Sequence, residues 1–175
     1  NNLKIRSTTI LGVRSKGKVA VAGDGQVTLG DMAMKQKAVK VRKFDSQKGG
    51  VVGGFAGAAA DALTLFEKFE QKLDEYEGDL KRSVVEMAKD WRTDKILRHL
   101  EALLLVMDKR NSFIIAGDGN VIEPDGQIVS IGSGGGFAQS AATAFLQSGK
   151  YSAKQIAAKS LKIAADLCIY TNDSI

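Results

Sequence analysis

The stretch Ser7-Thr8-Thr9-Ile10-Leu11-Gly12-Val13 decides how this sequence is interpreted, because it predicts the first strand and holds the main candidate for chemistry. Its β-branched and apolar residues are typical of a strand. Thr8 is also a candidate nucleophile, since a threonine at a free N-terminus can use its own α-amine as the base. Such an amine has a pKa of about 7.7–8 and is partly neutral at physiological pH. From these residues alone, both a plain strand start and a nucleophile exposed by removal of residues 1–7 stay open.

Length and composition predict a single globular domain. A chain of 175 residues can bury roughly 70% of its unfolded surface. No apolar run reaches the roughly 18 residues of a membrane span, and residues 1–6 lack the apolar core of a secretory signal. One cysteine, Cys168, allows no intramolecular disulfide and fits a reducing compartment. We therefore expect a cytoplasmic protein with no membrane partner.

The net charge of +5 raises the question of nucleic-acid binding. The basic residues are scattered among 20 acids, apart from the cluster KQKAVKVRK at residues 35–43. Aromatic residues do not interleave with this cluster as a base-stacking surface would require. A solvated face is the favoured interpretation, and we expect no nucleic-acid partner.

Hydrophobic periodicity predicts the order of the elements. Strands are predicted at residues 8–13, 18–22, 49–57, 104–107, 112–116, 121–122 and 127–131. Helices are predicted at residues 58–76, from the N-cap Asp79 on through Leu103, at residues 137–147, and after a capping box of Ser152 and Gln155. Because adjacent pairs of helices do not alternate with strands, we expect an α+β fold with helices flanking two packed antiparallel sheets.

Most familiar catalytic groups are scarce in this sequence. The only histidine, His99, lies among leucines, so a Ser-His-Asp triad is disfavoured. One histidine and one cysteine cannot supply a zinc site, and Cys168 is expected to be a small buried hydrophobe. The glycine run at residues 132–136 fits neither phosphate-binding pattern. Glycine turns at 53–57 and 132–136 could aim N–H donors at an oxyanion, or they could simply pack tightly.

Seven blocks, in order along the chain, carry a resemblance to a known family. They are TTIL at 8–11, AGDGQVTLG at 22–30, KVRK at 40–43, GFAG at 54–57, KDWRTD at 89–94, IGSGG at 131–135 and CIYTN at 168–172. Each block is weak alone, but together they resemble the HslV (ClpQ) family. Its members are peptidase subunits of the bacterial HslUV ATP-dependent protease and are related to proteasome β-subunits.

The resemblance implies roles for five residues. Thr8 is similar to the family's N-terminal threonine nucleophile. Lys40 resembles the lysine beside its hydroxyl, and Asp24 resembles the acid that pairs with this lysine. A fixed ammonium there would favour the alkoxide and lower the pKa of the amine. Gly54 resembles an oxyanion-hole donor, and Ser133 resembles the serine that completes the site.

The resemblance also implies a sodium ion held by the backbone carbonyls of Ala165, Cys168 and Thr171. The first position is commonly glycine, which carbonyl ligation should tolerate. Two features depart from the family pattern: seven residues ending in Ser7 precede Thr8, and residues 45–50 are about two residues longer than usual.

These implications define the expected protein. Residues 1–7 are a propeptide or an unprocessed extension, and residues 8–175 form one peptidase domain with a four-layer αββα sandwich. The chain is expected to be a threonine endopeptidase under allosteric control. It would form two stacked hexameric rings, a homododecamer, and cleave unfolded polypeptides delivered by the hexameric AAA+ ATPase HslU (ClpY). ATP would be used by this partner only, and no organic cofactor is expected. The alternatives are a non-catalytic or unprocessed ring subunit, and a small nucleotide-binding module suggested only by residues 132–136.

Overall fold

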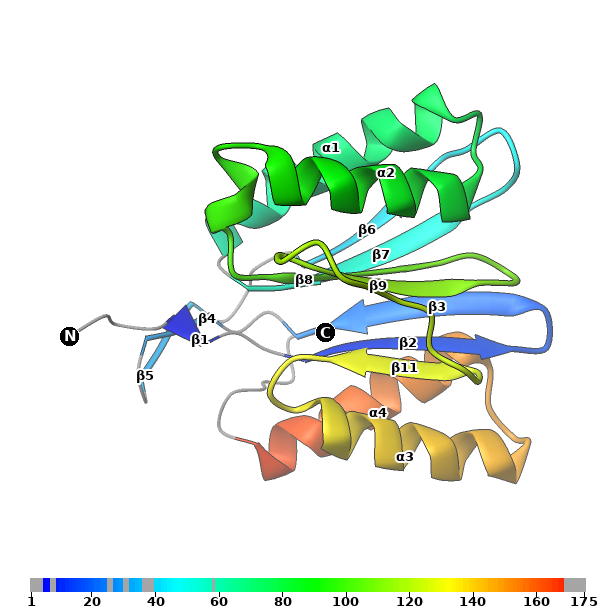
Figure 1. The fold of residues 1–175 in the computed structure, drawn as a ribbon. Helices are drawn as coiled ribbons and strands as arrows, with labels where there is room; N and C mark the ends of the chain where they lie inside the picture. The colour runs from blue at the N-terminus through cyan, green and yellow to red at the C-terminus, as the bar shows by residue number, and fades with distance from the viewer. Residues whose placement is uncertain are drawn as a thin grey trace.

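The four layers of the fold are helices, sheet, sheet and helices (Figure 1). The computed structural model describes residues 5–6, 9–24, 27–29, 32–35, 40–57 and 59–168. The upper helices are α1 (Ala59–Glu75) and α2 (Leu80–Thr93), and the lower ones are α3 (Gly135–Ser148) and α4 (Ala153–Leu167). This arrangement confirms the expected α+β sandwich.

Two antiparallel sheets form the middle layers. The first has the order β10-β9-β8-β7-β6, with bounds Val121–Ile122, Ser112–Ala116, Leu103–Met107, Val51–Ala56 and Val41–Phe44. The second has the order β11-β2-β3, with bounds Ile128–Ile131, Ile10–Ser15 and Lys18–Gly23. A smaller sheet, β1-β4-β5, consists of Ile5–Arg6, Val27–Leu29 and Met32–Lys35.

Local capping explains where the helices begin and end. The Asp79 carboxylate accepts a hydrogen bond from the Arg82 N–H at the start of α2. The capping box of Ser152 and Gln155 is present at the start of α4, as predicted. The last turn of α1 is followed by Gly78, whose φ of +77° suits glycine.

The prediction that the second helix continues through Leu103 is wrong. Asp94 ends α2, because its carboxylate accepts hydrogen bonds from the N–H groups of Ile96 and Leu97. A short 3-10 turn, η1 (Leu97–His99), follows, and Leu103 already belongs to β8. The apolar spacing that suggested a helix thus spans a helix end, a turn and a strand start.

Three apolar layers hold the sandwich together. The first, under α1 and α2, is built around Trp91, Phe44 and Phe69. The second, under α3 and α4, packs small side chains such as Ala138 and Ala142 against Leu11. The third lies between the two sheets and contains Ile10, Leu105, Met107, Val129 and Ile131 among others. We refer to this third group as the inter-sheet layer.

Glycines allow the two sheets to approach closely. A Cβ at Gly12 would collide with the Met107 sulfur, and one at Gly54 would collide with Ile10. Both glycines therefore match bulky apolar residues of the facing sheet, which any side chain would displace.

No helix in the described part of the chain is long and apolar enough to cross a membrane.

Candidate active site

A buried ion pair lies where several strands meet at one end of the sandwich. Asp24 directly follows β3, and Lys40 directly precedes β6. Lys40 Nζ lies 3.7 Å from Asp24 Oδ1, and both side chains are fully buried. Burial lowers the pKa of Lys40 to about 8, and the Asp24 carboxylate opposes this change by favouring the charged form. A lysine with a pKa lowered this far is unusual and marks this pair as a candidate for catalysis.

Backbone hydrogen bonds hold the pair in place. The Asp24 N–H donates to the carbonyl of the buried Thr9 at 3.2 Å, and the Phe55 N–H donates to the Lys40 carbonyl at 2.9 Å. The start of β2, the end of β3, the start of β6 and the end of β7 therefore meet around the two charges. The basic stretch 35–43 is thus no uniformly solvated face, because Lys40 is buried and residues 41–44 form β6.

The start of β2 lies between this pair and the glycine run. Ile10 pairs with Gly23 on one side and with Ile131 on the other. Asp24 follows the first partner, and Gly132 and Ser133 follow the second. The predicted nucleophile Thr8 lies outside the described residues, directly before Thr9.

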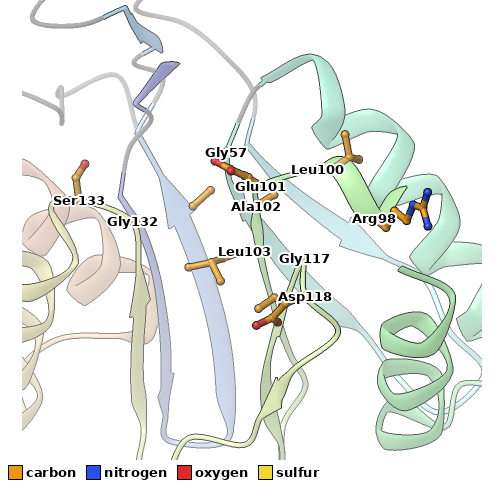
Figure 2. Close-up of a pocket in the computed structure, with 12 residues that line it drawn as sticks. Gly57, Arg98, Leu100, Glu101, Ala102, Leu103, Gly117, Asp118, Gly132 and Ser133 are labelled. Carbon is orange, nitrogen blue, oxygen red and sulfur yellow. The ribbon is translucent and has the colours of Figure 1, made fainter. Parts of the chain in front are cut away.

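A cavity of about 610 Å³ opens beside Ser133 (Figure 2). Gly132 and Ser133 line it from the sheet that contains β11, whereas Ala56 and Gly57 line it from the end of β7. The segment from Phe55 to Gly57 connects the cavity to the Lys40 carbonyl. Ser133 is exposed, so its hydroxyl is accessible at the cavity.

The two predicted glycine turns differ in their structural surroundings. Gly54 lies inside β7, paired with Val41 and Leu105, while Gly57 lies just past the end of the strand at the cavity. A Cβ at Gly135 would lie 3.1 Å from the Ser130 hydroxyl, so tight packing explains this glycine at the start of α3.

The remaining candidates lie elsewhere. His99 is exposed in η1. Cys168 is the C-cap residue just after α4 and is partly exposed, so the prediction of a buried cysteine is wrong. Of the predicted sodium ligands, Ala165 lies in the last turn of α4, and Thr171 lies outside the described residues.

The last carbonyls of a helix have no partner within it, and they lie at the negative end of its dipole. Oxygen donors of this kind fit a hard cation. In the described part of the chain, no cluster of three or more His, Cys, Asp or Glu side chains could hold a metal, so such an ion would depend on backbone oxygens.

The cavity walls were missed by sequence reasoning. Leu103 and Ala116 line the cavity, but apolar side chains carry no chemical signature in a sequence. The sequence signals that pointed to this region were the glycine turns at 53–57 and 132–136 and the candidate Ser133.

The four-layer sandwich, with a buried acid–lysine pair beside the start of β2, is the fold of the N-terminal-nucleophile hydrolases. Eukaryotic HslV from Trypanosoma brucei superimposes with a TM-score of 0.84 at 46% identity, covering 95% of each chain. BPH of Thiobacillus denitrificans shares the fold alone, with a TM-score of 0.73 at 21% identity over 94% of this chain and 93% of the other.

Sequence comparison identifies the family within this fold class. The proteasome subunit family model matches residues 5–175. The ATP-dependent protease subunit HslV of Treponema denticola is 55% identical over 172 residues, which cover 98% of this chain and 96% of the relative. The chain therefore belongs to the proteasome subunit family of proteases, in its HslV branch.

Proposed function

We propose that the chain is the peptidase subunit of an ATP-dependent protease and that Thr8, once residues 1–7 are removed, is its nucleophile. The observation that carries the proposal is the buried Lys40–Asp24 pair next to Thr9. Thr9, whose carbonyl accepts the hydrogen bond from the Asp24 N–H, directly follows Thr8 in the sequence. The proposed nucleophile is therefore one residue away from a contact with the ion pair.

In the proposed reaction, the free α-amine of Thr8 accepts the hydroxyl proton while the hydroxyl oxygen attacks the peptide carbonyl. The Lys40 ammonium stabilises the negative charge on that oxygen, and Asp24 keeps the ammonium charged. The α-ammonium then returns the proton to the departing amine as the C–N bond breaks. Water hydrolyses the resulting ester with the same amine as base, and the acid product leaves.

A backbone N–H of Gly54 or Gly57 would stabilise the oxyanion of each tetrahedral intermediate. Gly54 was the sequence candidate, and the position of Gly57 at the cavity makes it a further candidate. Ser133 would complete the site by hydrogen bonding to the amine or to the water.

Similarity to HslV proteins supports a proposal for the assembly and the partners. We propose two stacked hexameric rings in the cytoplasm, with unfolded polypeptides delivered by an HslU-type hexameric ATPase that consumes the ATP and controls activity. A sodium ion held by the carbonyls of Ala165, Cys168 and Thr171 would stabilise the segment after α4.

The N-terminus provides the test. A chain that begins at Thr8 should hydrolyse an unstructured fluorogenic peptide and form an adduct with a threonine-directed β-lactone that maps to Thr8. The same chain with an N-acetylated Thr8 should be inactive, because an amide has no basicity, and Thr8→Ala should form no adduct. Equal hydrolysis by the acetylated and free chains would exclude the α-amine as the base.

The intact mass of the protein distinguishes the proposed peptidase from the alternative, an unprocessed or non-catalytic ring subunit. A protein purified from its own cells that retains residues 1–7 would support this alternative, whereas a mass that begins at Thr8 would support the peptidase.

A further inference from the structure

A second cavity, of about 540 Å³, lies at the end of the sandwich opposite the Lys40–Asp24 pair (Figure 1). Three segments line it: the turn between β6 and β7, the start of α2, and the turn between β8 and β9. Lys40 directly precedes β6, whereas the cavity is lined by the turn that follows the other end of this strand. The cavity is therefore separate from the candidate active site.

Contacts within the fold hold the lining segments in place. The Arg14 guanidinium of β2 donates to the carbonyls of Asp108 and Asn111, at 3.0 and 2.7 Å, and so fixes the turn between β8 and β9. Before α2, a Cβ at Gly78 would lie 3.1 Å from the backbone nitrogen of Lys48, so the other two segments pack against each other. A ligand would therefore find the cavity already formed.

The cavity is lined by four basic side chains, which come from all three segments. They are Lys48, Lys81, Lys109 and Arg110. All four are exposed, and none of them forms a salt bridge with a residue in the described part of the chain. Their charges are therefore available to an anion from outside.

The two carboxylates that line the cavity have backbone partners. Asp79 caps α2 by accepting from the Arg82 N–H at 3.0 Å. Asp108 accepts from the N–H groups of Arg110 and Asn111, at 2.7 and 2.6 Å. Cap and turn formation thus explain both acids. Four cations against two carboxylates leave an excess of two positive charges around the cavity.

Lys81 stands at an unfavourable position for a lysine. It lies in the first turn of α2, near the positive end of the helix dipole, and the capping Asp79 is followed by no acid in that turn. The neighbouring Arg82 is accommodated by the ring of Tyr76, whose centroid lies 4.5 Å from the guanidinium carbon. A bound anion would make the position of Lys81 favourable, because helix N-termini and cations both attract negative charge.

We propose that this cavity binds a small anion with several linked phosphate groups, such as tripolyphosphate or the triphosphate of a nucleotide. A single phosphate contacts few of the cations, whereas a row of phosphates can reach cations from all three segments, and the cavity has the volume of a small-ligand site. The bound anion would join the three segments and stabilise the folded chain. This site goes beyond the proposed peptidase function and does not depend on it.

Isothermal titration calorimetry with tripolyphosphate tests the site, on the assembled protein near physiological ionic strength. The double variant Lys81→Gln, Lys109→Gln should bind tripolyphosphate about 10-fold more weakly or less tightly still, because it loses two charge-assisted contacts. The matched control is Lys154→Gln, Lys162→Gln, at two exposed positions of α4 outside the cavity. It lowers the net charge equally and should bind like the wild type.

Two further ligands define what the site recognises. Inorganic phosphate should bind the wild type at least about 10-fold more weakly than tripolyphosphate, because it forms fewer of the charged contacts. ATP that binds more tightly than tripolyphosphate would identify a nucleotide as the ligand, whereas equal or weaker binding would identify an inorganic oligophosphate; both outcomes support the site.

Three outcomes would overturn the site. They are no binding of tripolyphosphate by the wild type, equal affinity for phosphate and tripolyphosphate, and equal losses in the two double variants. The last result would reveal only general attraction to a chain of net charge +5. Peptide hydrolysis by the same wild-type preparation tests the proposed function separately, so a failure of either proposal can be told from a failure of the other.

Discussion

Burial singles out Lys40 among the lysines, since it is the only one that the described part of the chain buries completely. Its charge is retained near neutrality because Asp24 lies within ion-pair distance. This pair is the residue-scale feature on which the proposed chemistry depends, and two predictions test it.

Lys40→Ala should reduce peptide hydrolysis by about 10²-fold or more, because the reaction loses a preorganised charge in a site that excludes water. Lys40→Arg should not restore activity, since a planar guanidinium differs from an ammonium in shape and hydration. Lys43→Ala, an exposed position in the same strand, is the control. The measurement is the steady-state rate of peptide hydrolysis by assembled, processed rings of each variant. Near-normal turnover by Lys40→Ala would show that Lys40 does not take part in catalysis.

The pH profile should report Lys40 directly. Its ammonium is present below the pKa of about 8, so kcat/KM should decline as pH rises through this value. Asp24→Asn removes the carboxylate that raises this pKa, and the decline should therefore move to lower pH. The exposed Asp125→Asn should leave the profile in place. A profile that is unchanged, or moved to higher pH, in Asp24→Asn would contradict the assignment.

At the scale of elements, strand β2 is central because it pairs with both β11 and β3 and packs against the facing sheet. Gly12 permits the facing sheet to approach. Gly12→Ala should lower the free energy of unfolding by about 1–3 kcal/mol, because the new methyl group would collide with Met107.

Gly136 is the matched control for Gly12. Nothing lies within 4 Å of a Cβ built at Gly136, in the first turn of α3. Gly136→Ala should leave stability unchanged or raise it by up to about 1 kcal/mol, since alanine favours the helix. Urea unfolding measures both variants, and equal effects would show that inter-sheet spacing does not depend on Gly12.

At the scale of the whole molecule, large apolar side chains remain exposed. Leu63, Ile96 and Leu167 have exposed fractions of 61%, 75% and 62%. The proposed ring assembly would cover part of this apolar surface. Sedimentation should show a particle far above the 18.7 kDa of one chain, and a clean monomer at micromolar concentration would contradict the compartment that the proposed function requires.

Local signals in the sequence were sufficient for much of the fold. The helix starts at Asp79 and Ser152 were predicted because capping bonds join residues three apart. The end of α2 was not, because apolar spacing continued past the Asp94 cap. The candidates Lys40, Asp24 and Ser133 came from a resemblance rather than from periodicity.

The sequence by itself determined the strand and helix types and the family blocks, because these depend on neighbours along the chain. Only the tertiary structure decided that Lys40 is buried against Asp24, since strand pairing brings together residues that local patterns treat as independent. It also decided that Leu103 and Ala116 form the floor of a cavity. An apolar side chain looks the same in a sequence whether it lies inside the core or at a cavity, and only the packing of the two sheets places these two at the cavity.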